Sequence, residues 1–183
     1  MTDYPHEVLP MFAEPYFRAT IAGAISPEQV AHLKSLPLVD RQGNYFSENL
    51  YVLEDPQLKS IKDAVHEALD IYAREILGIP QRFYVTQSWT QVQNPNLGMP
   101  GLSYANSIVS GVLYCGEQPA PPATINFSRH DTYQLIELQP DADRRNVFNT
   151  QTTRITPNHN EVVLFASRLT HIVDPNTTNQ QRF

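Results

Sequence analysis

The chain has 183 residues, of which 41% are hydrophobic and 17% are charged, and this composition is typical of an ordered soluble globule and excludes a disordered or fibrous chain. Its length suits one substantial core better than two, so we expect a single domain over residues 1–183. With 13 Lys and Arg against 19 Asp and Glu, the net charge of −6 offers no basic surface, and neither nucleic acid nor membrane is expected as a partner.

The N-terminus lacks the features of a targeting segment. Residues 1–7 contain neither a basic region nor a long apolar stretch, and no later run approaches the length of a membrane span. We therefore predict a cytoplasmic protein. The single cysteine, Cys115, lies at the end of the apolar run 108–115, so no internal disulfide can form and a buried free thiol is expected.

Two helices are predicted within residues 1–80. Ser26 is a good N-cap with Gln29 three residues later, which predicts a capping box and a short helix over 26–36. A second helix over 56–76 ends before Gly78, because glycine and the proline that follows it stop a helix. The second helix has apolar residues three and four apart, which give it one apolar face: Leu58, Ile61, Val65, Leu69, Tyr72 and Ile76.

After residue 81 the apolar period changes from near 3.6 to near two, which predicts strands. The predicted strands cover 82–92, 107–114, 123–127, 132–138 and 161–165. Short strands separated by Pro, Asn and Asp clusters indicate an antiparallel sandwich or barrel. The expected fold is therefore α+β and mainly β: residues 1–80 form an extended segment and two buttressing helices, and residues 81–183 form the β core.

Six histidines are the first candidates for a catalytic or metal site. His6 lies near the terminus, and His32 and His66 flank the apolar faces of the two predicted helices, so we interpret all three as solvated. His159 lies in the turn-forming stretch 157–160, where an exposed side chain is expected.

The remaining two histidines follow predicted strands. His130 precedes Asp131, and adjacent residues point in different directions, so an ion pair in a loop with Arg129 nearby is a simpler interpretation than a shared metal. His171 opens a short apolar stretch, and the pattern alone leaves a core, turn or functional role open.

Four segments together resemble a known family. They are 86–89, 106–114, 163–167 and 171–176, and Arg182 follows the last. In this order they are similar to the Fe(II)/2-oxoglutarate oxygenases that are common in marine bacteria and cyanophages. The resemblance implies a double-stranded β-helix, which is a cupin-like jelly roll, with Fe(II) and 2-oxoglutarate as cofactors.

The resemblance also implies where a site would lie. In this family the iron is held by a His-x-[His/Asp/Glu] pair just before the Asn-Ser-x-x-Ser-Gly string and by a later histidine. Here the pair corresponds to Leu102 and Tyr104, and the later histidine to His171. If the protein is active, Arg182 would bind the far carboxylate of 2-oxoglutarate, with Tyr114 also on the cofactor.

Two functional hypotheses follow. Leucine cannot coordinate iron and tyrosinate needs a lowered pKa, so we predict that the metal site is lost, that Leu102 and Tyr104 fill the old pocket, and that this pseudoenzyme is a binding, assembly or virion-associated structural module. Its partners would be other protein chains or further copies of itself, in the host cytoplasm if it is phage-encoded. The alternative is an active 2-oxoglutarate-dependent dioxygenase, a hydroxylase, with replacement ligands from Tyr104, His130 or Asp131.

Overall fold

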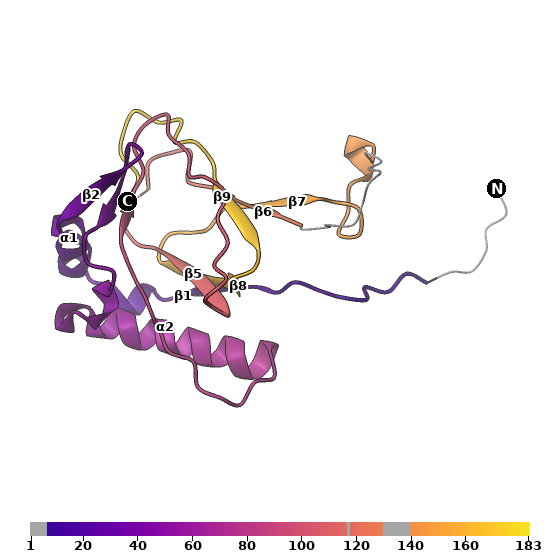
Figure 1. The fold of residues 1–183 in the computed structure, drawn as a ribbon, viewed down its shortest axis with the longest axis horizontal. Coiled ribbons are helices and arrows are strands. Elements are labelled where there is room, and N and C mark those ends of the chain that lie inside the picture. Colours follow the sequence, from indigo (N-terminus) through magenta and orange to yellow (C-terminus); the bar gives the residue numbers. More distant parts are fainter. Residues whose placement is uncertain (1–6, 117, 130–139) are drawn as a thin grey trace.

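The computed structural model describes residues 7–116, 118–129 and 140–183 (Figure 1). The predicted strand over 132–138 and the residues His6, His130 and Asp131 lie outside the described residues. Within them, the stretch before the first strand runs away from the body of the protein, and the rest forms three short sheets and a long helical segment.

The first helix begins as the sequence predicts. After a 3-10 turn, η1 (Ala22–Ala24), α1 spans Pro27–Ser35. The Ser26 hydroxyl accepts a hydrogen bond from the Gln29 amide at 3.2 Å, and the Gln29 side chain accepts one from the Ser26 amide at 3.0 Å. Two otherwise unpaired backbone donors are thereby satisfied, which confirms the capping box.

The second helix is built from three helical types. A 3-10 turn, η3 (Pro56–Leu58), leads into α2 (Lys59–Ile71), which continues as the π-helical turn η4 (Tyr72–Ile76). These three elements cover the predicted range 56–76. Helices in the described part of the chain are all too short or too polar to cross a lipid bilayer.

His32 is not solvated, so that prediction is wrong. Its Nε2 lies 2.7 Å from a carboxylate oxygen of Asp55, and its side chain is only 21% exposed. Asp55 follows the 3-10 turn η2 (Val52–Glu54) and also accepts a hydrogen bond from the Gln57 amide at 2.9 Å. The Gln57 amide and His32 both lower the pKa of Asp55, so this pair fastens α1 to the start of α2.

Nine strands in the described residues form three antiparallel sheets. The sheet orders are β1 (Tyr16–Thr20), β8 (Glu161–Ala166), β5 (Val109–Tyr114); β2 (Leu38–Arg41), β3 (Asn44–Ser47), β4 (Gln91–Val92); and β7 (Thr152–Ile155), β6 (Ile125–Ser128), β9 (Thr170–Val173). A 3-10 turn, η5 (Ala142–Arg144), lies between β6 and β7.

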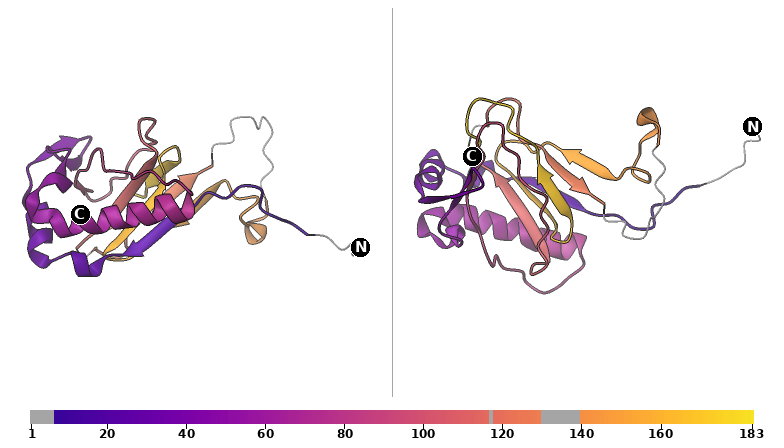
Figure 2. Two further views of the ribbon diagram at one scale, coloured as in Figure 1. Left: turned by 90° about the horizontal axis from the view of Figure 1, so that it is seen from below. Right: turned by 45° about the horizontal axis from the view of Figure 1, so that its top comes forward.

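Strand β8 is the centre of the fold because both of its faces are buried. Val162 and Leu164 pack against α2, while Val163 and Phe165 pack against two buried side chains of β6. Helix α2 consequently lies along the outer face of the β1-β8-β5 sheet, and the β7-β6-β9 sheet covers the inner face (Figure 2). Burying side chains of this size stabilises the fold by about 1.5–3 kcal/mol each.

The sequence misplaced some strands. Only Gln91 and Val92 of the predicted strand over 82–92 pair as a strand. Phe83 packs against the α2 core and Tyr84 is exposed, so the alternation is real although the backbone there has no neighbouring strand. Strands β1, β2 and β3 were not expected, and through them residues 1–80 join the sheets.

Candidate functional site

Leu102 and His171 lie opposite each other on two neighbouring antiparallel segments of the chain. The Leu102 amide donates to the His171 carbonyl at 3.1 Å, and the His171 amide donates to the Leu102 carbonyl at 3.0 Å. Residues that exchange both hydrogen bonds in an antiparallel pair project their side chains from the same face, with Cα atoms about 5.5 Å apart. The structure therefore brings together two of the three positions that the resemblance assigned to iron.

Tyr104 completes this group. Its amide donates to the Ser167 carbonyl at 2.9 Å, which holds the segment against the turn between β8 and β9. Its ring centroid lies 6.0 Å from that of His171 and 6.0 Å from that of Trp89. Leu102, Tyr104 and His171 thus converge at one end of the sandwich, a placement that suits a site.

His171 itself could serve as a metal ligand. Its ring packs 4.8 Å from Phe165 and 6.1 Å from Phe127, centroid to centroid, and burial lowers its pKa. The neutral imidazole places its Nδ1 at 3.1 Å from the Leu169 carbonyl oxygen. Because that oxygen can only accept, Nδ1 carries the proton and Nε2 keeps a free lone pair.

The other two positions do not fit iron. Leu102 has no donor atom, and burial raises the pKa of Tyr104, which opposes the tyrosinate that a metal would need. In residues 7–116, 118–129 and 140–183, no three His, Cys, Asp or Glu side chains are grouped so that they could hold a metal ion. The described residues therefore do not fit Fe(II), which needs several preorganised donors.

Arg182 keeps a feature that suits a carboxylate. It is 4% exposed, and its backbone exchanges hydrogen bonds of 2.7 and 2.9 Å with Gln93. Its Nη2 donates to the Pro121 carbonyl at 2.6 Å, but its buried Nε has no acceptor. Burial lowers its pKa and Asp174 opposes this, so an unpaired donor on a buried cation would be stabilised by an anionic group.

Tyr114 lies in the core at the end of β5. It packs against the buried cluster between the two facing sheets, which includes Phe127 and Phe165. Burial, and secondarily the neighbouring Tyr16, raises its pKa. The phenol is therefore neutral, and it can act as a hydrogen-bond donor but not as an anionic ligand.

A cavity of about 560 Å³ opens beside the convergent group. Its walls are formed by Arg41, Gln42, Asn44, Phe46, Leu50, Gln87, Trp89, Gly98, Met99, Pro100, Leu102 and Tyr104. Leu102 and Tyr104 form part of this wall and Leu102 is 39% exposed, whereas His171 is not among the lining residues. That Leu102 and Tyr104 fill the old metal pocket stays a prediction.

The β2–β3 hairpin supplies four of the cavity residues that sequence reasoning missed. Arg41 pairs with Asn44 across a two-residue turn in which Gln42 and Gly43 have φ values of 58° and 87°. Two positive φ values match the twist of a tight hairpin, and a side chain at Gly43 would meet Leu97 at 2.6 Å. The Gln-Gly pair between two short apolar runs was the only signal for this turn.

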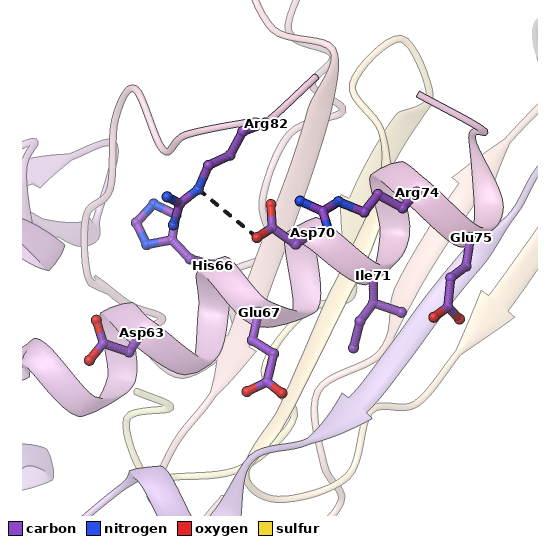
Figure 3. Close-up of a pocket in the computed structure, with 8 residues that line it drawn as sticks. All are labelled: Asp63, His66, Glu67, Asp70, Ile71, Arg74, Glu75 and Arg82. Atoms are coloured by element: carbon purple, nitrogen blue, oxygen red, sulfur yellow. Dashed lines mark ion pairs between the residues drawn. The ribbon is translucent and has the colours of Figure 1, made fainter. Parts of the chain in front are cut away.

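A second cavity, of about 390 Å³, lies along α2 (Figure 3). Its side chains carry both signs of charge, with Arg82 Nε 4.0 Å from Asp70 Oδ2, and they are Asp63, His66, Glu67, Asp70, Ile71, Arg74, Glu75 and Arg82. Because α2 and His171 pack on opposite faces of β8, this groove is remote from the convergent group. We interpret it as the solvated face of the helix.

Several residues of the segments that resemble the family connect strands and loops of the fold. The hydroxyls of Ser110 and Ser167 lie 2.8 Å apart and join β5 to the end of β8. Asn176 is fully buried and donates to the carbonyls of Gln93 and Gln180 at 3.2 and 2.7 Å. These side chains hold chain segments together, and we assign them a structural role.

Known proteins resemble the chain at two levels. Residues 87–183, more than half of its length, match the model of a family described as "Putative 2OG-Fe(II) oxygenase". Among solved structures, an oxidoreductase of the 2OG-Fe(II) oxygenase family from Burkholderia pseudomallei has a TM-score of 0.62 at 10% identity, over 91% of this chain and 80% of that one. No curated protein matches the sequence significantly.

Two further solved structures come from nogalamycin biosynthesis. The alpha ketoglutarate dependent carbocyclase SnoK has a TM-score of 0.57 at 15% identity, over 92% of this chain and 76% of that one. The epimerase SnoN, in complex with Fe3+, alpha ketoglutarate and nogalamycin RO, has a TM-score of 0.59 at 13% identity, over 92% and 76%. At these identities the likeness is one of fold, the α+β fold of 2OG-Fe(II) oxygenases.

Proposed function

The chain belongs to the 2OG-Fe(II) oxygenase family, and we propose that within this family it is a non-catalytic protein that binds a ligand and holds no iron. One observation carries the proposal: Leu102, Tyr104 and His171 converge, yet only His171 offers a metal donor. A single imidazole binds a divalent ion too weakly to sustain turnover.

The cavity supports the binding part of the proposal. A volume of about 560 Å³ lies within the usual range for small-molecule sites, and its walls combine aromatic and apolar side chains with a few polar ones. Loss of the metal ligands does not remove this space, since Leu102 and Tyr104 form part of its wall. The protein can therefore keep a ligand site without keeping the reaction.

The proposal is tested by metal content and turnover. Purified full-length protein would be incubated with Fe(II), ascorbate and 2-oxoglutarate, and succinate would be measured by mass spectrometry. We expect no succinate above the His171→Ala control and less than about 0.1 iron per chain after desalting, because one imidazole does not retain the ion. Succinate formation that depends on His171 would overturn the proposal.

An active dioxygenase is the second candidate, and the comparisons favour it. The matching family and the similar solved structures are oxygenases. Within the chain, the free Nε2 of His171 and the unpartnered Nε of Arg182 are the two features that suit iron and 2-oxoglutarate. Under this candidate, the missing donors would come from Tyr104, His130 or Asp131, and alanine at whichever position supplies them would abolish succinate formation.

The predicted role in an assembly, as a homo-oligomer or in a virion, stays a prediction. Exposed apolar side chains do precede β1, with Met11 84% and Phe12 91% exposed. Sedimentation of the full chain at micromolar concentrations tests this role, because an assembly unit would sediment faster than the 20.8 kDa monomer.

A further inference from the structure

The cavity beside the convergent group has aromatic walls. Phe46 comes from β3, and Trp89 and Tyr104 come from the segments on either side of β4 and its following loop. The Trp89 and Tyr104 ring centroids lie 6.0 Å apart with an interplanar angle of 58°. Aromatic faces pack favourably on flat conjugated molecules, so the walls favour a planar ligand.

The charge of the cavity is unlike that of the whole chain. Among the described residues, Arg41 is the only charged one that lines it and no carboxylate does so, although the chain has a net charge of −6. The Arg41 guanidinium carbon lies 5.3 Å from the centroid of the Phe46 ring, and no ion pair ties it to an acid in the described residues. A guanidinium held on a ring with its donors free is suited to a carboxylate.

The amide side chains of the cavity have different roles. Asn44 is already used by the fold, since it donates to the Gly98 carbonyl at 3.0 Å and accepts from the Asn94 amide at 3.0 Å. Gln42 and Gln87 are exposed at the cavity and are free to orient a polar substituent. The polar groups are thus few, and the only strong one is a cation.

We propose that this cavity binds a planar aromatic carboxylate, with its rings against Phe46, Trp89 and Tyr104 and its carboxylate on the Arg41 guanidinium. The inference deepens the proposed function by naming the class of ligand. It involves no bond making or breaking, and it does not depend on iron. A cavity of about 560 Å³ accommodates a molecule of two or three fused rings.

Three probes separate charge from shape, and calorimetry in the presence of EDTA measures their affinities. They are 2-naphthoate, which is planar and anionic, 2-naphthalenemethanol, which is planar and neutral, and cyclohexanecarboxylate, which is anionic and not planar. We expect 2-naphthoate to bind about tenfold more tightly than either of the others. Trp89 is the only tryptophan, so its emission should change on binding.

A matched pair of arginine variants locates the charge. Arg41→Gln should weaken 2-naphthoate binding about tenfold and leave the neutral alcohol unchanged. Arg74→Gln, in the groove along α2, should leave all three affinities unchanged. Because both arginines are exposed, circular dichroism should show the same fold for both variants.

Failure of this inference and failure of the proposed function have different signatures. Equal affinities for the three probes, no measurable binding, or an unchanged affinity in Arg41→Gln would overturn the inference. None of these results bears on iron content or succinate formation, which decide whether the protein is catalytic. Conversely, succinate formation together with Arg41-dependent naphthoate binding would overturn the proposed function and support the inference.

Discussion

Two regions of the molecule differ in how far their side chains match the family pattern. In the frame, made of Ser110, Gly111, Ser167 and Asn176, the characteristic side chains make the contacts that the fold needs. The convergent group of Leu102, Tyr104 and His171 is called the mouth below. Its backbone brings the three positions together, but Leu102 and Tyr104 lack the imidazole or carboxylate that would bind iron. Similarity of sequence segments thus reports the frame directly, whereas positions 102 and 104 have to be judged from the chemistry of their own side chains.

The largest effect is expected in the frame, at Gly111. A β-carbon there would lie 2.8 Å from the Val163 carbonyl oxygen and 2.7 Å from a Leu164 methyl, so β5 and β8 would have to separate. Gly111→Ala should therefore lower the free energy of unfolding by about 3 kcal/mol, as severe overpacking does. Urea denaturation monitored by circular dichroism measures this loss.

Gly23 provides the matched control for that substitution. A β-carbon at Gly23 would meet no atom within 4 Å, so Gly23→Ala should leave stability within about 0.5 kcal/mol of the wild type. Equal effects at the two glycines would mean that Gly111 is not a close-contact position, and the contrast between frame and mouth would lose its firmest support.

The second prediction concerns a double variant that would restore metal ligands at the mouth. Leu102→His/Tyr104→Asp would add an imidazole and a carboxylate on the face where His171 already projects. If the mouth lost only side-chain chemistry, this double variant should bind Co(II) at least about a hundredfold more tightly than the wild type, because three donors replace one. Calorimetry gives the affinity, and the visible spectrum of Co(II) reports its coordination.

The control for the restored site also removes His171. Adding His171→Ala to the double variant should weaken Co(II) binding at least about tenfold relative to the double variant, because two donors remain of three. If the double variant binds no better than the wild type while it stays folded, the backbone at the mouth does not keep the geometry of a metal site, and the two regions differ in more than their side chains.

A third and smaller effect is expected at Asn176. Asn176→Ala would remove four hydrogen bonds made by a fully buried side chain, two to the carbonyls of Gln93 and Gln180 and two from the amide and hydroxyl of Thr178, and it would leave the Thr178 amide without its acceptor. The expected loss is about 2 kcal/mol in the free energy of unfolding, the usual cost of unsatisfied buried polar groups. Thermal and urea unfolding both measure it.

Asn146 is a suitable comparison for Asn176. It also bonds to the local backbone, accepting from the Phe148 amide and donating to the Arg144 carbonyl, but it is exposed. Asn146→Ala should cost less than about 0.5 kcal/mol because water replaces the lost partner. A loss at Asn146 as large as that at Asn176 would show that burial is not what makes Asn176 part of the frame.

Much of the fold could be predicted from the sequence, where local chemistry decides it. The capping box at Ser26 and the apolar face of residues 56–76 are local patterns, and both appear in the structure, except that Ile76 at the end of this face is 48% exposed. Strand β1 was missed because its partner is distant in the sequence, with Phe17 opposite Leu164. The β2–β3 hairpin is local, but its strands of four residues are too short to show a clear alternation. Residues 82–87 show the opposite case. Their side chains mostly alternate between exposed and partly buried, but no neighbouring strand pairs with them and they form no sheet.

The candidate site divides in the same way. The resemblance placed Leu102, Tyr104 and His171 together, and the structure brings them together. Arg41 and Phe46 could not be found from the sequence, because they reach the cavity through a hairpin whose only signal is a Gln-Gly turn. Residues that line a cavity from a separate sheet carry no motif of their own.

The smallest expected effect is the pH dependence contributed by His171. Burial lowers its pKa in the folded protein below the unfolded value of about 6.5, so between these two values the unfolded chain binds more protons. The free energy of unfolding should then rise with pH through this window, so that this stabilisation is fully present above about pH 6.5 and is lost as the pH falls. His171→Gln should flatten the profile measured from pH 5 to 8, whereas His66→Gln, on α2, should not remove this component.

EDTA provides the control for a bound metal at the mouth. Because the mouth is proposed to hold no metal, EDTA should leave the wild-type pH profile unchanged. A profile that steepens or shifts on adding EDTA would show that an ion normally binds His171, and the mouth would then have kept its ability to bind a metal.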